Sequence, residues 1–194
     1  DDKFYHEMTA FHEIALNGFL EYMSDIITTV KGQAVASLSE NDTEEFTVME
    51  LIKRVNILMK HELKNAYIYL NVLMKIDENQ IIHGNVNVLV QVVNNMISNA
   101  IQAYDGKHDQ NIQLEISKDS GNVIFSVTDF AGGLPKEVQD RLFKEMVTTK
   151  GKNGTGLGLY MSYSNIKAHF GGDITYKTED GKGTTFNILI PINK

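Results

Sequence analysis

Apolar residues recur at steps of three and four along the first 35 residues, which is the spacing of a helix with one narrow hydrophobic stripe. The stripe consists of Phe4, Met8, Phe11, Ala15, Phe19, Tyr22, Ile26 and Val30. A single helix has nothing against which to bury such a stripe. We therefore expect residues 1–36 to form a long helix that pairs with another helix, in a second copy of the chain or in a segment before Asp1.

A second pattern begins after a polar stretch that predicts a linker at residues 37–45. Thr47 and Glu50 have the spacing of a capping box, and Phe46 and Leu51 that of a hydrophobic staple. The helix that starts there carries Leu51, Ile52, Val55, Leu58 and Met59. Residues 66–74 then alternate between apolar and polar side chains, which predicts a strand.

The remaining elements follow from caps, turns and alternation. Asn85 or Asn87 is expected to cap a helix that ends near Tyr104. Residues 111–117 and 122–129 predict a hairpin. Further helices are expected at 136–143 and 156–170, and the last strands at 173–178 and 184–190. Helices and antiparallel strands mixed in this way predict an α+β fold, a two-layer α/β sandwich over residues 46–194, preceded by the long helix.

The composition narrows the function. Hydrophobic residues make up 42% of the 194 residues and charged residues 22%, so the chain can bury a core. The net charge is −7 and no block of Lys or Arg occurs, which gives no support for binding nucleic acid or an anionic membrane. The chain has no cysteine, which excludes thiolate chemistry, and no run of eighteen apolar residues. We expect a cytoplasmic segment of a longer protein, and that longer protein could be anchored to a membrane through another segment.

The first chemical motif is a polar stripe on the predicted helix that ends near Tyr104. Asn95 and Asn99 are four residues apart and so project from one face, and Gln91 and Gln102 extend the stripe. Asparagine is a mediocre helix former, and its amide can bind Mg²⁺ through oxygen or phosphate through nitrogen. A solvated polar face is the plain alternative.

The second and third motifs combine small residues with polar ones. Asp129 ends an apolar strand and is followed by Ala131, Gly132 and Gly133, so that a flat ring could approach the backbone while the carboxylate accepts a hydrogen bond. An Asx-turn is the plain alternative. The third motif is a glycine-rich loop that leads into a helix N-terminus, where backbone N–H groups can bind phosphate. The loop consists of Gly154, Thr155, Gly156, Leu157 and Gly158. It fits neither GxxxxGK[ST] nor GxGxxG, and a flexible surface loop is its plain alternative.

Taken together, the order and spacing of these motifs resemble those of one ATP-binding superfamily, which comprises histidine kinases, DNA gyrase, heat-shock chaperones and mismatch-repair ATPases. Within it the chain is most similar to sensor histidine kinases. Residues 95–100 resemble the N box, 129–133 the first glycine box, 142–150 the F box, 154–159 the second glycine box, and 183–186 the terminal glycine motif. The resemblance covers about residues 46–194.

The resemblance implies a Bergerat-type ATP pocket. Asn99 would bind Mg²⁺, Asn95 the phosphates and Asp129 the adenine amino group. Gly133 and Leu134 would line the base, and Thr184 would lie near Asp129. Residues 143–155 would close over the triphosphate. The phosphate contacts would include Gln102, Thr149, Lys150 and the second glycine box, with Asn95 and Lys150 as the catalytic residues.

Chemistry favours phosphoryl transfer over hydrolysis. The gyrase and chaperone branches carry a glutamate four residues before the Mg²⁺-binding asparagine, whereas this chain has Asn95 there, and an amide is no general base. Two departures from the kinase pattern are Ala131, where a glycine usually stands, and Gln102, where a basic residue is common. Weaker nucleotide affinity would be the expected effect of Ala131.

The phosphoacceptor histidine is not evident. The sequence after His61 is Glu62-Leu63-Lys64-Asn65, which resembles the acceptor block, but Ala66 replaces the proline and the segment is expected between a helix and a strand. His12 and His6 match the block less well, and His83, His108 and His169 have no second metal ligand at a suitable spacing. We expect residues 19–35 to be the second helix of a dimerisation hairpin, with the acceptor before Asp1.

The function expected from the sequence is a histidine kinase catalytic domain that binds Mg²⁺ and ATP and donates a phosphoryl group to a histidine, for relay to a response regulator receiver domain. A homodimer through the N-terminal helix is also expected. Two alternatives stay open: an ATPase clamp of the gyrase or mismatch-repair type, and a nucleotide-binding module that regulates without catalysis.

Overall fold

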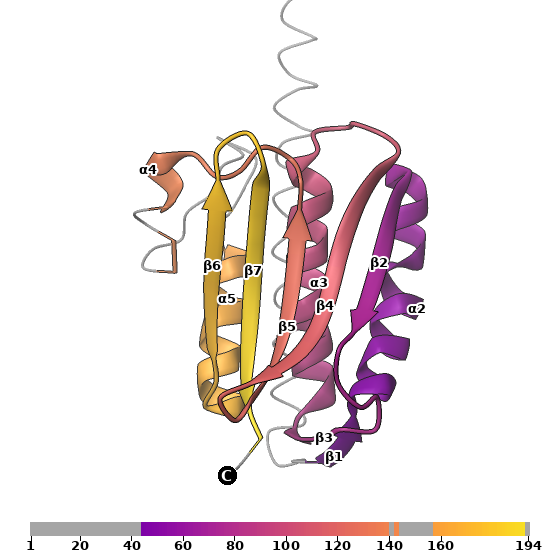
Figure 1. The fold of residues 1–194 in the computed structure, drawn as a ribbon, viewed down its shortest axis with the longest axis vertical. Helices are drawn as coiled ribbons and strands as arrows, with labels where there is room; N and C mark the ends of the chain where they lie inside the picture. Colours follow the sequence, from indigo (N-terminus) through magenta and orange to yellow (C-terminus); the bar gives the residue numbers. More distant parts are fainter. Residues whose placement is uncertain (1–43, 140–141, 144–156, 193–194) are drawn as a thin grey trace, which may run out of the picture.

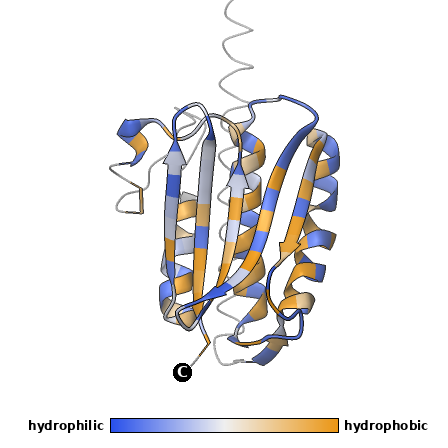
Figure 2. Cartoon of the chain, in the orientation of Figure 1, coloured by the Kyte–Doolittle hydropathy of each residue, from blue (hydrophilic) through white to orange (hydrophobic). Residues whose placement is uncertain are grey.

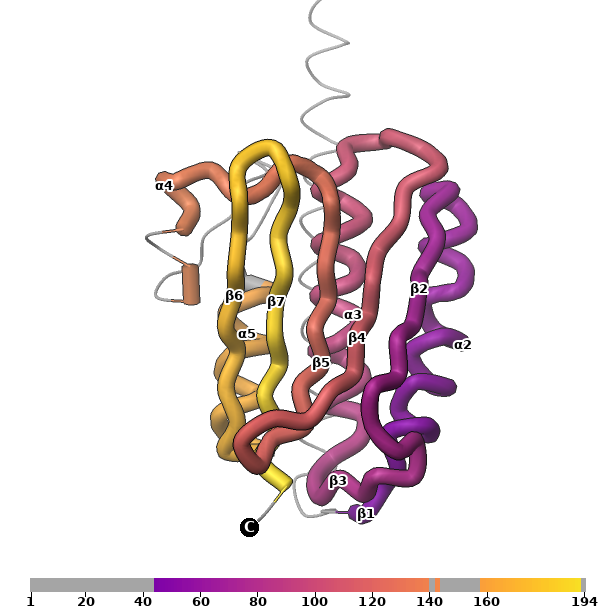
Figure 3. The backbone as a smooth tube through the Cα atoms, in the orientation of Figure 1, coloured from indigo at the N-terminus to yellow at the C-terminus, as the bar shows by residue number. Residues whose placement is uncertain are grey.

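The computed structural model describes residues 44–139, 142–143 and 157–192. Within them a five-stranded sheet has the order β2-β4-β5-β7-β6, and a two-stranded sheet pairs β1 with β3. The five strands are β2 (Ile68–Met74), β4 (Gln110–Asp119), β5 (Asn122–Asp129), β6 (Asp173–Glu179) and β7 (Gly183–Pro191). Only β2 and β4 run parallel, because α3 lies between them along the chain, and the other pairs are antiparallel. Figure 3 follows this path of the chain.

Three helices lie on one face of the sheet: α2 (Val48–Ala66), α3 (Val86–Ala103) and α5 (Leu157–Asn165) (Figure 1). A short π-helical turn, η2 (Ile166–Phe170), continues α5. Apolar and polar residues alternate along the strands, and the apolar ones on the helix side are buried (Figure 2). The two-layer α/β sandwich that the sequence predicts is therefore confirmed.

The caps predicted for two helices form. The Thr47 hydroxyl accepts a hydrogen bond from the Glu50 backbone N–H at 3.1 Å, and the Asn85 side chain caps α3 by accepting from two backbone N–H groups. The capping box of α2 is not reciprocal, because the Glu50 carboxylate pairs with Arg54 at 2.6 Å. Phe46 and Leu51, the predicted staple, are both buried.

The sequence missed the small sheet. β1 (Glu44–Thr47) and β3 (Ile81–Gly84) are antiparallel strands of four residues each. Each is too short to show a clear alternation, and the pairing joins residues far apart in sequence. β1 begins at Glu44, so the last two residues of the predicted linker belong to this strand. The predicted N-terminal helix of residues 1–36 and most of that linker lie outside the described residues.

Three details of the helices differ from expectation. The first helix extends to Ala66, so His61 lies inside α2 with an exposed side chain, and not between a helix and a strand. Its Nδ1 pairs with Asn65 Nδ2 at 3.0 Å. Leu58, expected on the apolar face, is 60% exposed. The described part of the predicted helix at 136–143 is short, with α4 covering Lys136–Gln139.

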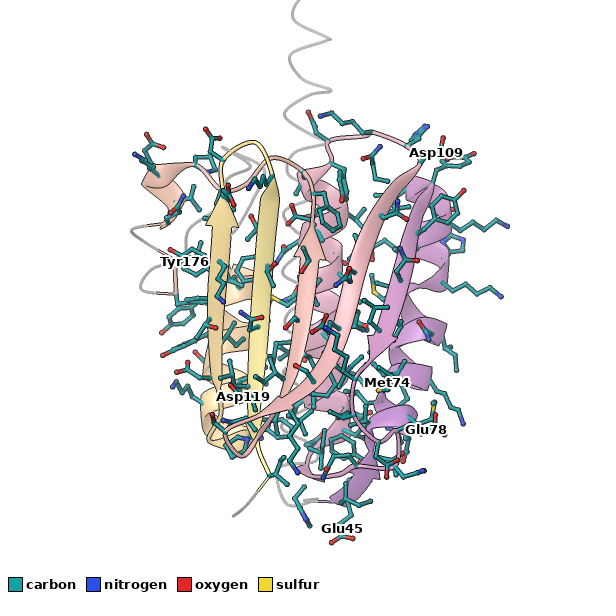
Figure 4. The ribbon with its side chains drawn as sticks, in the orientation of Figure 1. Glu45, Met74, Glu78, Asp109, Asp119 and Tyr176 are labelled. Carbon is teal, nitrogen blue, oxygen red and sulfur yellow. The ribbon has the colours of Figure 1, made fainter. Side chains whose placement is uncertain are left out.

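Several chain segments meet at one end of the sheet, at the top of Figure 1. β5 ends there, the turn between β6 and β7 lies beside it, and α3 reaches the same end before β4 begins. Figure 4 marks the two ends of β4, with Asp109 just before its start and Asp119 at the opposite end of the strand. Asp129 lies at this end of the sheet, where β5 terminates. It is the residue expected from the sequence to bind the base of a nucleotide.

Candidate nucleotide site

Asp129 occupies an inward-facing position at the end of β5. The alternation that buries Val123, Phe125 and Val127 continues for one more step and points the Asp129 side chain toward the helical layer, where it is 6% exposed. A carboxylate at such a position requires partners, because burying a charge without hydrogen bonds is costly. Burial raises the pKa of Asp129, and the backbone N–H groups that donate to it act in the opposite direction.

Backbone N–H groups provide the partners of Asp129. Its Oδ1 accepts from the N–H of Ala131 at 3.0 Å and from the N–H of Thr184 at 3.3 Å. The second contact follows from strand pairing, since Asp129 and Thr184 stand opposite each other on β5 and β7. Within the described part of the chain, both hydrogen bonds from other residues end on Oδ1. Oδ2 is therefore the oxygen left for an external donor.

Two threonines connect Asp129 to the loop that follows it. The hydroxyls of Thr178 and Thr184 are 3.1 Å apart, and the Leu134 backbone N–H donates to the Thr178 hydroxyl at 2.8 Å. We call Asp129, Leu134, Thr178 and Thr184 the Asp129 cluster. Gly133 lies against it so closely that a Cβ there would be 2.7 Å from the Glu179 carbonyl oxygen. The loop thus needs glycine at this position, where φ is also +93°.

The second group of predicted residues connects α3 to α5. The Asn95 Nδ2 donates to the Gly158 carbonyl oxygen at 2.9 Å and to the Ser162 hydroxyl at 3.0 Å. Asn99 lies one helical turn further along α3. We call Asn95, Asn99, Gly158 and Ser162 the Asn95 cluster. Gly158 packs directly on Asn95, since a Cβ at Gly158 would be 3.0 Å from that nitrogen.

The contacts of Asn95 refine its expected role. A side-chain amide has two N–H bonds, and here both have acceptors, while Oδ1 accepts none of the hydrogen bonds found among the described residues. In this conformation Asn95 therefore presents an oxygen and not a donor. An oxygen ligand suits a hard divalent cation, whereas phosphate binding through nitrogen would require Asn95 to exchange one of its partners.

The structure brings most of the described candidates to these two clusters. Gln102 is exposed on the last turn of α3, and Leu157 is the first residue of α5. Thr149, Lys150, Gly154, Thr155 and Gly156 lie outside the described residues. Among residues 44–139, 142–143 and 157–192, no group of three or more His, Cys, Asp or Glu side chains is placed to hold a metal ion. No helix in the same ranges is long and apolar enough to cross a membrane.

Sequence reasoning missed three contributors, namely Thr178, Ser162 and Tyr104, whose hydroxyl accepts from the backbone N–H of Phe130, the residue after Asp129. A signal existed for two of them. Thr178 and Thr184 have the spacing of a cross-strand pair around the turn of a hairpin, and Ser162 is four residues after Gly158 on a helix. Tyr104 gives no such signal, because its partners depend on how three separate segments pack.

Comparison with known proteins identifies the family. Residues 84–194 match the model of the histidine kinase-, DNA gyrase B- and HSP90-like ATPases, which is more than half of the chain. This chain belongs to that family. Both clusters lie inside the matched segment. The ATP-binding superfamily that the sequence resembles is thereby confirmed.

Individual relatives of this ATPase-family domain are sensor kinases. Sporulation kinase C of Bacillus subtilis (strain 168) is 28% identical over 170 residues, which cover 88% of this chain and 37% of the relative. Sensor histidine kinase ZraS of Escherichia coli (strain K12) is 39% identical over 105 residues, which cover 54% of this chain and 22% of the relative. The domain thus spans well under half the length of these relatives.

A solved structure of similar extent also matches. The nucleotide-free catalytic domain of histidine kinase ThkA superposes with a TM-score of 0.67 at 27% identity, covering 77% of this chain and 95% of that one. Full-length ShkA in complex with AMPPNP superposes with a TM-score of 0.68 at 23% identity, covering 88% of this chain and 36% of that one, and shares the fold. Within the family, this ATPase-family domain is a histidine kinase catalytic domain, as the sequence predicts.

Proposed function

We propose that this domain binds ATP together with Mg²⁺ and transfers the γ-phosphoryl group to a histidine outside the described residues. The observation that carries the proposal is the geometry of Asp129. Its buried carboxylate is fixed through Oδ1 by two backbone N–H groups, while Oδ2 stays available to an amino group of a base. A fixed hydrogen-bond acceptor lies beside a loop that has no room for a side chain at Gly133. Such a site suits a flat heterocycle that carries an exocyclic amine.

The walls of this base site come from the Asp129 cluster. Gly133 brings bare backbone close to β6, and Leu134 adds an apolar side chain that is partly buried against the core. The Thr184 hydroxyl adds a small polar group next to Asp129. Adenine presents the amine that Asp129 requires, whereas guanine has a carbonyl oxygen at the corresponding ring position and would be repelled by the carboxylate.

The phosphate side of the proposal rests on the Asn95 cluster. Asn95 and Asn99 present amide groups on one face of α3, and the free Oδ1 of Asn95 fits a Mg²⁺ ion, with Asn99 as the proposed direct ligand. When bound, Mg²⁺ would supply positive charge that neutralises the charge of the phosphates. We assign further phosphate contacts from the motif positions alone, to Gln102, Thr149, Lys150, Gly154, Thr155, Gly156, Leu157 and Gly158.

Transfer is proposed over hydrolysis because Asn95 is an amide and cannot activate water. Both of its N–H bonds are also occupied, which leaves it as a neutral oxygen ligand. Charge neutralisation and positioning are sufficient for phosphoryl transfer to a supplied acceptor. The histidine acceptor, its relay to a response regulator receiver domain, and a homodimer formed through residues 1–36 are parts of the same proposal. They follow from the resemblance to sensor kinases.

Binding of a non-hydrolysable ATP analogue tests the first part. Calorimetric titration should show an affinity that falls when Mg²⁺ is replaced by EDTA. Absence of binding at millimolar analogue would overturn the proposal. Extending the chain upstream and adding radiolabelled ATP should then produce acid-labile, alkali-stable phosphate on a histidine. Steady release of ADP without any acceptor would favour the ATPase clamp, and binding without transfer would favour a regulatory module.

A further inference from the structure

Tyr104 is a buried phenol at the end of α3. It caps the helix, its side chain lies in the core, and the residue is 2% exposed. Its hydroxyl donates to the Asn111 carbonyl oxygen at 2.5 Å and accepts from the Phe130 backbone N–H at 2.9 Å. The directions are fixed, because a carbonyl can only accept and an N–H can only donate. One side chain therefore ties together α3, the start of β4 and the residue after Asp129.

The N–H of Phe130 belongs to the peptide group that also carries the Asp129 carbonyl. The carbonyl side of this peptide is packed against Gly183, where a Cβ would be 2.0 Å from the Asp129 carbonyl oxygen. Tyr104 thus holds the N–H of this peptide by a hydrogen bond, and Gly183, the first residue of β7, packs against the carbonyl oxygen of the same peptide. The Asp129 Cα is bonded to this peptide, so a displacement of the peptide would shift the Cα and with it the carboxylate, whose other restraints are hydrogen bonds from Ala131 and Thr184.

We propose that Tyr104 is a positioning residue for the nucleobase: its hydroxyl fixes the Asp129–Phe130 peptide and thereby the direction in which the Asp129 carboxylate faces the base. The inference rests on the proposed function, since it assumes that Asp129 accepts from an exocyclic amine. A recognition group is effective only if its support holds it within about 0.5 Å of the productive geometry. Tyr104 supplies this support from outside the pocket and touches no ligand itself.

The hydroxyl is suited to this role over the working pH range. Burial, and to a lesser degree the negative charge of Asp129, raises the pKa of Tyr104, although the hydrogen bond from Phe130 lowers it. The phenol therefore stays protonated and continues to donate to Asn111. Its second lone pair remains available to Phe130.

A purely structural role makes a different prediction. If Tyr104 only satisfied the Asn111 carbonyl and filled the core, its hydroxyl would contribute to the free energy of unfolding and not to the choice of base. Tyr104→Phe keeps the ring and removes only the hydroxyl. It should lower the melting temperature under either interpretation. The two interpretations differ in whether the affinity ratio between two nucleotides changes.

The experiment compares ATP with purine riboside triphosphate, which lacks the 6-amino group. Dissociation constants are measured with Mg²⁺ for the wild type, Tyr104→Phe and the exposed control Tyr69→Phe. We expect Tyr104→Phe to weaken ATP binding about 3- to 10-fold and leave the analogue nearly unchanged, so that the ratio falls. Tyr69→Phe should retain the wild-type ratio. An unchanged ratio in folded Tyr104→Phe would overturn the inference.

A double-mutant cycle shows whether Tyr104 acts through Asp129. In an Asp129→Asn background, the effect of Tyr104→Phe on the ratio should largely disappear, because the acceptor that it positions is already lost. An equal effect in both backgrounds would contradict the inference, whatever the stability of the single variants. Failure of the proposed function is distinguishable, since then the wild type would bind neither nucleotide.

Discussion

The Asp129 cluster and the Asn95 cluster are built in different ways. In the first, side chains on paired strands are held by backbone N–H groups and by one another: Asp129 stands opposite Thr184, and Thr178 opposite the same residue from β6. The second depends on one side-chain amide that reaches from α3 to α5. The base side is therefore part of the fold, whereas the phosphate side is held by contacts that a ligand can exchange. A substitution that crowds the backbone beside the first cluster should therefore cost the most stability, and substitutions in the second cluster should act mainly on the part of the ATP affinity that depends on Mg²⁺.

The largest expected effect is on stability, at Gly183. A Cβ there would overlap the Asp129 carbonyl oxygen at 2.0 Å and approach the Phe130 Cα at 2.8 Å, both of which are backbone atoms that cannot move alone. We expect Gly183→Ala to lower the free energy of unfolding by about 3 kcal/mol, measured by urea denaturation. Gly181→Ala is the matched control in the same turn. It meets no atom within 4 Å, and its positive φ should cost about 1 kcal/mol. Equal losses in the two variants would contradict the tight fit at β5.

The second prediction is a large loss of affinity with little loss of stability. Asp129→Asn keeps the size of the side chain but replaces an acceptor-only group by one that can also donate. We expect ATP affinity in calorimetric titration to fall about 10- to 100-fold. The folded protein should tolerate the change, because burial already disfavours the charged form of Asp129. Thr185→Ser, on the outer side of β7, is a control that should leave ATP affinity unchanged.

The raised pKa of Asp129 makes the difference in stability between the wild type and Asp129→Asn depend on pH. A carboxyl whose folded pKa is raised contributes most to stability at low pH, and this contribution is lost as pH rises through the folded value. The stability of the wild type relative to Asp129→Asn should therefore be greatest in acid and decline toward neutral pH. ATP binding should show the opposite trend and weaken in acid, as the carboxyl takes up a proton. A difference in melting temperature between the two proteins that stays the same at all pH values would contradict this prediction.

The difference between the clusters also explains what could be predicted from the sequence. Alternation along β5 places Asp129 on the buried face, and the helical spacing of Asn95 and Asn99 places both on one face of α3. Local rules therefore identify the chemical groups. They do not give the partners, because the bond from Asn95 to Ser162 crosses 67 positions and that from Tyr104 to Phe130 crosses 26. The order of the glycine motifs supplied the missing long-range information.

The same reasoning accounts for the errors in the fold. β1 and β3 exist because they pair with each other over 34 or more positions, which no window along the chain reveals. Leu58 fits the helical spacing of α2 and is nevertheless exposed. Periodicity gives the direction in which a side chain points from the helix axis, but not how wide a face of the helix the rest of the protein covers. His61 was misplaced because Asn65 and Ala66 carry no strong signal for the end of a helix.

The third prediction concerns the metal side of the second cluster. Asn99→Ala should lower ATP affinity about tenfold in the presence of Mg²⁺ and change it little in EDTA, because only an amide oxygen that ligates the ion depends on its presence. Asn111→Ala is a control on the exposed face of the sheet, where the Asn111 side chain accepts from Asn71 at 3.3 Å. Equal losses with and without Mg²⁺ would instead indicate that Asn99 contacts the nucleotide directly.

The smallest effect is expected at Ser162, which is 2% exposed and accepts one of the two N–H bonds of Asn95. Ser162→Ala leaves that donor without its partner, so Asn95 gains freedom to turn while its bond to Gly158 persists. We expect a loss of about 1 kcal/mol in stability and a two- to threefold weaker affinity for ATP with Mg²⁺. Ser126→Ala removes a comparable hydroxyl, which donates to Asn187 at 2.7 Å on the outer face of the sheet. It should lose stability without losing affinity. If both serine variants bind ATP like the wild type, Asn95 is held well enough by Gly158 alone, and the two clusters are more alike in rigidity than their hydrogen bonds indicate.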